Sequence, residues 1–197
     1  MPHLRRLLPA LAACLALALT GTSSLAIAGG SDHSPRAEHG VRHDAEHGCG
    51  PNGYSAWDEQ WLMMSIQGDR FEIQGGELAQ HQASTDKVRA LGARLVKDHS
   101  QSLEDATALA ERLGIDVPDS PSPTQQWELR TVAQFHGREF DRRYADLEVQ
   151  DHKQDIREAQ DEIDKGCNPD IRDEAKSELP VLQEHLQLAE DALQSVS

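Results

Sequence analysis

Residues 138–165 read REFDRRYADLEVQDHKQDIREAQDEIDK. Small or apolar residues and one histidine recur along this stretch in steps of four and three: Ala145, Val149, His152, Ile156, Ala159 and Ile163. A helix with 3.6 residues per turn places such positions on one face. The stretch therefore predicts a long helix with a buried stripe, and that stripe contains a histidine.

Three other stretches show the same period, and we expect helices at about 57–83, about 85–113 and from Pro169 to about Ser195. Ser55 is the expected N-cap of the first helix, whereas Gly114 and Gly166 end the second and third. Three glycines within 57–83 lower the helix propensity, so we expect close helix packing there. The fold class is all-α.

The second and third long helices are joined by residues 114–136, which hold three prolines and a short helical piece beginning at Ser122–Pro123. A link of this length can run along a bundle, whereas the other links are short. This pattern predicts a ferritin-like four-helix bundle with a long crossover between helices 2 and 3. The alternative is a plain up-down bundle in which the link folds over one end.

The N-terminus has the features of a secretory signal peptide. Arg5 and Arg6 precede an apolar stretch, Leu7–Leu19, and an Ala26-Ile27-Ala28 site follows. We expect cleavage after Ala28 and export to the periplasm or cell envelope. The alternative is a lipoprotein anchored through Cys14, and no later apolar run is long enough for a transmembrane helix.

Residues 29–53 are rich in glycine, histidine and charge, so we expect a disordered lead-in before a bundle domain at 54–197. His39, His43 and His47 are spaced by four in this lead-in. In a transient helix they would share one face and take up copper, nickel or zinc. The alternative is a soluble linker.

The chain carries 19 Lys and Arg against 34 Asp and Glu, a net charge of −15. This charge repels nucleic-acid phosphates, so we expect no nucleic-acid partner. It favours cations, basic partners or simple solubility.

Signal cleavage leaves Cys49 and Cys167, which predict a disulfide in an oxidising compartment; two free thiols are the alternative. Cys49 precedes the first helix and Cys167 lies between the third and fourth. A plain up-down bundle would separate these points by ~40 Å. The ferritin-like order brings them to one end, so we predict the Cys49–Cys167 disulfide.

One polar residue lies near the middle of each long helix, all within ~5 Å of one level: Glu72, His99, His152 and His185. Imidazoles and carboxylates that converge from several helices predict a transition-metal site. The alternative is a set of core histidines that bond acids on neighbouring helices. Asp98 and Asp151 precede two of the histidines, and we expect them to flank the core.

Several runs together resemble the bacterial "domain of unknown function 4142" family: Phe71–Ala79, Val96–His99, Phe140–Asp141 with Tyr144, Asp151–His152, and Leu179–Pro180 with His185–Leu186. The resemblance spans about Trp57 to Leu193. It implies a ferritin-like fold in the periplasm or envelope, and no agreed activity.

The sequence departs from di-iron ferritins, which use Glu-x-x-His pairs. Val96, Val149 and Leu182 stand three residues before the three histidines, so a carboxylate-bridged iron pair is not supported. No catalytic motif is found. We expect an exported, non-enzymatic envelope protein that binds a transition metal for stress tolerance or metal buffering. The alternatives are a ferritin-like metal-dependent oxidase or peroxide-consuming enzyme, and a purely structural or interaction module.

Overall fold

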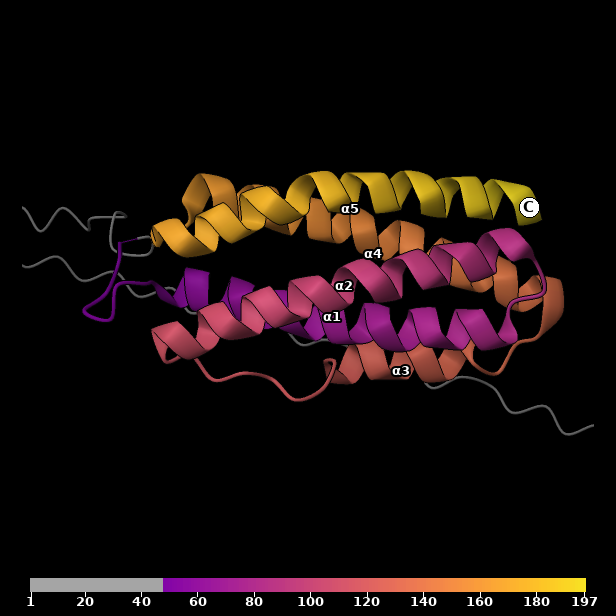
Figure 1. Ribbon diagram of the computed structural model, residues 1–197, viewed down its shortest axis with the longest axis horizontal. Helices are drawn as coiled ribbons and strands as arrows, with labels where there is room; N and C mark the ends of the chain where they lie inside the picture. The colour runs from indigo at the N-terminus through magenta and orange to yellow at the C-terminus, as the bar shows by residue number, and fades with distance from the viewer. Residues whose placement is uncertain (1–47) are drawn as a thin grey trace, which may run out of the picture. The chain divides into compact units, whose positions relative to one another are not determined.

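The computed structural model describes residues 48–197, in which five helices and no strands are found (Figure 1). The helices are α1 (Ala56–Gln82), α2 (Asp86–Leu113), α3 (Pro123–Val132), α4 (Gly137–Lys165) and α5 (Pro169–Val196). The all-α prediction is confirmed, and the bounds lie close to those expected. Within the described residues, none of the helices is long and apolar enough to cross a membrane. The predicted signal peptide, Cys14, His39, His43 and His47 lie outside the described residues.

The helix ends follow from local capping chemistry. The Ser55 side chain accepts a hydrogen bond from the backbone N–H of Asp58, which completes a capping box for α1. Ser122 does the same for α3, and Asn168 caps α5. Gly114 adopts φ 72° at the end of α2, a left-handed conformation that glycine tolerates best. The predicted ends of these helices are therefore confirmed.

Helices α1 and α2 are antiparallel neighbours, as are α4 and α5, while α2 packs beside α5 and α1 beside α4 (Figure 1). The short helix α3 lies against α1. At the start of α4, the Asp141 carboxylate accepts hydrogen bonds from the N–H groups of Ser84 and Thr85, at 2.8 and 2.9 Å. Residues 114–136 thus link the end of α2 to the opposite end of the helices.

The core has two apolar clusters with a polar layer between them. One cluster contains Leu95 and Val149, and the other contains Ile66, Ala159 and Leu182. Each of the four long helices contributes residues to both clusters. The polar residues that lie between the two clusters along these helices include Glu72, His99, His152 and His185. We call this region the central polar layer.

Close packing of α1 on α2 depends on two glycines. A Cβ at Gly76 would lie 2.5 Å from the backbone oxygen of Gly92, and one at Gly92 would lie 2.7 Å from the oxygen of Gly76. The predicted close packing is confirmed at Gly76. At Gly68, in contrast, a Cβ would meet nothing within 4 Å.

The start of α1 and the turn between α4 and α5 are joined covalently. Cys49 and Cys167 form a disulfide with a Cα–Cα distance of 5.4 Å. Beside it, the buried Asp58 carboxylate accepts hydrogen bonds from the N–H groups of Cys167 and Asn168, at 2.8 and 3.0 Å. Residues 48–53, the end of the expected lead-in, form a turn at this same end.

Candidate metal centre

Three histidines from three helices converge in the central polar layer. His99 lies on α2, His152 on α4 and His185 on α5. Their ring centroids are 5.1 Å (His99–His185), 5.4 Å (His152–His185) and 5.9 Å (His99–His152) apart. His152 and His185 are fully buried, and His99 is 6 % exposed. We call these residues the histidine trio.

One nitrogen of each imidazole is held by a polar group outside the trio. His99 Nδ1 lies 2.8 Å from Asp69 Oδ1, and His185 Nε2 donates to Asp98 Oδ2 at 3.0 Å. His152 Nδ1 is 2.9 Å from the backbone oxygen of Glu148, and it is the donor because a carbonyl only accepts. These contacts fix the orientation of each ring.

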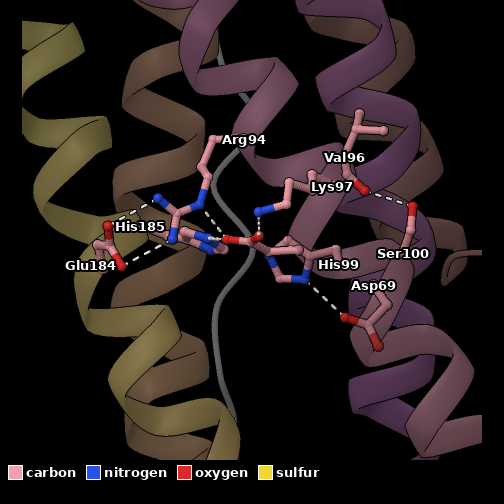
Figure 2. Close-up of polar contacts among 9 residues, drawn as sticks. Asp69, Arg94, Val96, Lys97, His99, Ser100, Glu184 and His185 are labelled. Carbon is pink, nitrogen blue, oxygen red and sulfur yellow. Dashed lines mark hydrogen bonds and ion pairs between the residues drawn. The ribbon is translucent and has the colours of Figure 1, made fainter.

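Asp98 is itself held in place by charge. Arg94 donates to Asp98 and, through Nη1 and Nη2, to both carboxylate oxygens of Glu184, at 2.9 Å each (Figure 2). Although burial raises the pKa of Asp98, its contacts with Arg94 and His185 lower it below its usual value on balance. Asp98 is therefore an ionised carboxylate that accepts a hydrogen bond from His185.

The other nitrogen of each imidazole has no partner. His99 Nε2, His152 Nε2 and His185 Nδ1 are all buried and make no hydrogen bond. One nitrogen from each histidine lies within 4.8 Å of one nitrogen of the other two. In a structural polar network these atoms would be hydrogen-bonded, because an unpartnered buried polar atom is unfavourable.

Burial keeps the three imidazoles neutral. It lowers the pKa of His152 to about 3, with a smaller contribution from the neighbouring His99. Burial also lowers the pKa of His99 and of His185 to about 4. Neutral imidazoles present lone pairs, which is the form that binds metal ions.

A cleft leads from the surface to the trio. Its volume is about 320 Å³, and its lining includes His99, His185, Asp69, Asp98 and Arg94. The lining residues come from α1, α2, α4 and α5. His99 and His185 therefore border this cleft, whereas His152 does not line it.

The sequence places Glu72 at the level of the histidines. In the structure, Glu72 lies near His152 and near other acids. Its Oε1 and the Oε2 of Glu148 each lie 3.8 Å from His152 Nδ1. Ligand atoms of Glu72, Asp151 and Asp155 also lie within 4.8 Å of one another. Both oxygens of Glu72 and of Glu148, and Oδ2 of Asp151, are buried without hydrogen-bond partners.

Burial also disfavours the charged forms of these acids. It raises the pKa of Glu72 well above its usual value, and the charge of Glu148 raises it further. The pKa of Glu148 is raised to about 8, and those of Asp151 and Asp155 are raised as well, chiefly by burial. Protons or a cation must compensate this group.

The histidines were identifiable from the sequence, but Asp69, Glu148 and Asp155 were missed. A signal for two of them exists on α4, where buried or half-buried acids recur at every seventh position: Asp141, Glu148, Asp155 and Glu162. Seven residues are about two helical turns, so these acids share a face with His152. Asp98 pairs with a histidine on another helix, in line with its expected flanking position.

The comparison with known families agrees with the resemblance found in the sequence. Residues 45–192 match the family described as "Domain of unknown function (DUF4142)". The chain belongs to the DUF4142 family. The resemblance found in the sequence is thus confirmed, and this membership assigns no activity.

Among solved structures, the chain is similar to the crystal structure of a DUF305 fragment from Deinococcus radiodurans. The TM-score is 0.64 at 13 % identity, and the match covers 72 % of this chain and 98 % of that one. At this identity the likeness concerns the fold alone. No curated protein matches the chain.

Proposed function

We propose that this DUF4142 protein binds a transition-metal ion at the histidine trio. Two observations carry the proposal: one nitrogen of each imidazole lies within 4.8 Å of a nitrogen of the other two, and each ring has one buried nitrogen without a partner while its opposite nitrogen contacts an aspartate or a carbonyl. Outer contacts of this kind orient the histidines that ligate metals in proteins. Glu72 is not assigned to this site. It approaches the protonated Nδ1 of His152, and its other neighbours are Glu148, Asp151 and Asp155.

The ligand set favours a borderline metal. Three imidazoles suit zinc, copper, nickel, cobalt or iron better than magnesium or calcium. His99 Nδ1 and Asp69 Oδ1 lie 2.8 Å apart, and a cation at His99 Nε2 would favour the tautomer that carries its proton on Nδ1 and donates it to Asp69. The trio would then offer three lone pairs to one ion.

A fourth ligand position would face the acidic cleft. Three histidines with an open position are typical of catalytic zinc sites, whereas closed four-ligand sites are structural. The cleft lined by His99 and His185 is thus the observation that favours the second candidate function, an enzyme that uses the bound metal. The leading proposal is a binding protein that buffers the metal in the envelope.

Export to an oxidising compartment is part of the proposal. It is supported by the signal-peptide features of residues 1–28 and by the Cys49–Cys167 disulfide, since such bonds persist outside the cytosol. N-terminal sequencing of the secreted protein should read from Gly29. A start at Cys14 would instead indicate the lipoprotein.

We also infer a ferritin-like arrangement in which α1, α2, α4 and α5 are the bundle and α3 belongs to the crossover. Support comes from the link at residues 114–136, which joins opposite ends of the helices, and from the disulfide between the start of α1 and the α4–α5 turn.

The deciding experiment is metal analysis of tag-free protein, stripped with a chelator and then equilibrated with zinc or copper. All proteins carry His39→Ala, His43→Ala and His47→Ala, so that the N-terminal histidines do not contribute. This background should retain about one equivalent of metal after desalting, since the trio offers one site. Adding His99→Ala and His152→Ala should abolish it.

The matched control is His81→Ala, which removes an exposed histidine in the last turn of α1. It should keep the full metal content. Cobalt provides a second readout, because its visible absorption bands report tetrahedral nitrogen coordination directly. Unchanged metal content in the double histidine variant would overturn the proposal, and so would a metal-free background protein.

A further inference from the structure

We propose that Glu72, Asp151 and Asp155 form a second cation site, distinct from the histidine trio, for a hard divalent ion such as Mn²⁺. The three side chains come from α1 and α4, and one oxygen of each lies within 4.8 Å of the others. No property of the histidine trio is needed for this site.

In the described part of the chain, these acids have no basic partner within 4 Å apart from His152, and their other polar neighbours are further acids. Glu72 is fully buried, and neither of its oxygens has a hydrogen-bond partner; the same is true of Asp151 Oδ2. Within residues 48–197, the only basic side chain that approaches Glu72 or the adjacent Glu148 within 4 Å is His152. Buried carboxylates without hydrogen bonds or cationic partners are strongly unfavourable unless a cation or protons compensate them.

The chemistry of the ligands defines the class of ion. Three carboxylates supply oxygen ligands only, and such sets favour manganese, calcium or magnesium over zinc or copper. His152 Nδ1 donates to the backbone oxygen of Glu148, so this nitrogen has no lone pair for a metal. The two sites would therefore select different ions.

The second site borders a hollow of its own, although Asp155 also lines the cleft beside the histidine trio. Asp151 and Asp155 line a hollow of about 340 Å³ whose walls come from α1, α3 and α4. Glu128 on α3 and Glu158 on α4 add negative charge to the same hollow. Acidic walls raise the local concentration of cations, and α3 thereby gains a role beyond linking the long helices.

The test is a titration of chelator-treated, tag-free protein with Mn²⁺ in 150 mM salt, which screens weak surface binding. Electron paramagnetic resonance measures free Mn²⁺. The wild type should remove about one equivalent from solution, since the three acids form one site. Glu72→Gln and Asp155→Asn should each weaken this binding roughly tenfold or more. The Mn²⁺-dependent rise in melting temperature should disappear in both variants.

Two controls separate this site from other binding. Asp146→Asn removes an exposed acid of α4 and should bind Mn²⁺ like the wild type. His185→Ala should lose the metal of the trio but keep Mn²⁺, so the two proposals can fail independently. Circular dichroism verifies that each variant is folded; if Glu72→Gln is not, the half-buried Asp155→Asn decides.

Three results would overturn the second site. The first is a wild type that leaves all Mn²⁺ in solution. The second is equal binding by Asp155→Asn and the wild type, which would place the ion on the acidic surface. The third is loss of Mn²⁺ in His185→Ala, which would mean one merged centre.

Discussion

Asp58 and Glu72 are both fully buried carboxylates on α1, yet their surroundings differ completely. Asp58 lies at the disulfide end and accepts hydrogen bonds from the N–H groups of Ser55, Cys167 and Asn168, at 2.6, 2.8 and 3.0 Å. Glu72 lies in the central polar layer and accepts none. Although burial raises the pKa of Asp58, its hydrogen bonds lower it on balance, whereas the pKa of Glu72 is raised.

We interpret this difference as structural burial at Asp58 and, under the proposals above, as ligand-binding burial at Glu72. Where a carboxylate joins parts of the chain, the fold supplies donors to it, as it also does for Asp141 at the other end. Where single carboxylate oxygens and imidazole nitrogens are buried without hydrogen-bond partners, the fold tolerates a loss of stability. Such a loss is typical of sites that bind a ligand.

The largest expected effect concerns the disulfide end. Replacing Cys49 and Cys167 with serine opens a loop with a sequence separation of 118. Loss of this constraint on the unfolded chain should reduce the free energy of unfolding by ~4–5 kcal/mol. Urea denaturation followed by circular dichroism measures it.

The same variant tests whether the two regions are independent. Its metal content at the histidine trio should match the wild type under conditions where both are folded. A loss of bound metal would contradict this independence, because metal binding at the histidine trio would then depend on the disulfide end.

A matched pair of isosteric substitutions tests the comparison directly. Asp58→Asn should lower the free energy of unfolding by ~2–3 kcal/mol, because an amide nitrogen would face backbone N–H donors. Glu72→Gln should have no effect or stabilise the metal-free protein by ~1 kcal/mol, because glutamine avoids the cost of keeping this buried acid either protonated or charged. Both are measured by urea denaturation in the presence of a chelator. Equal losses in the two variants would contradict the distinction.

A further expected effect concerns Glu162, a buried acid of α4 near the disulfide end. Burial, followed by the charge of Asp58, raises its pKa to about 8 despite Arg172 nearby. The folded protein thus binds this proton more tightly than the unfolded chain does. The associated stability is fully present below pH 4.5 and is lost as the pH rises through 8.

Glu162→Gln should therefore match the wild type near pH 4.5 and be more stable by roughly 1–2 kcal/mol at pH 8.5. Urea denaturation at the two pH values measures the difference between the proteins. A constant difference at both values would show that Glu162 does not titrate in this range.

Much of the fold could be predicted because helix signals are local. The four-and-three spacing on 138–165, the N-cap at Ser55 and the capping box at Ser122 depend on neighbours in the sequence, and all are found in the structure. The three mid-helix histidines could also be identified, because a helix rises by a fixed distance per residue and equal positions therefore reach equal heights.

The partners of those histidines were decided only by the tertiary structure. Rise per residue gives height, but the direction of a side chain depends on how each helix is rotated and which helix packs beside it. That rotation brings Asp98 to His185 and Asp69 to His99, and it places Glu72 beside Asp151 and Asp155 as well as 3.8 Å from His152 Nδ1. The sequence by itself determined the helices and the level of the site, whereas packing decided which atoms lack partners, because hydrogen bonds between helices depend on contacts that no local pattern contains.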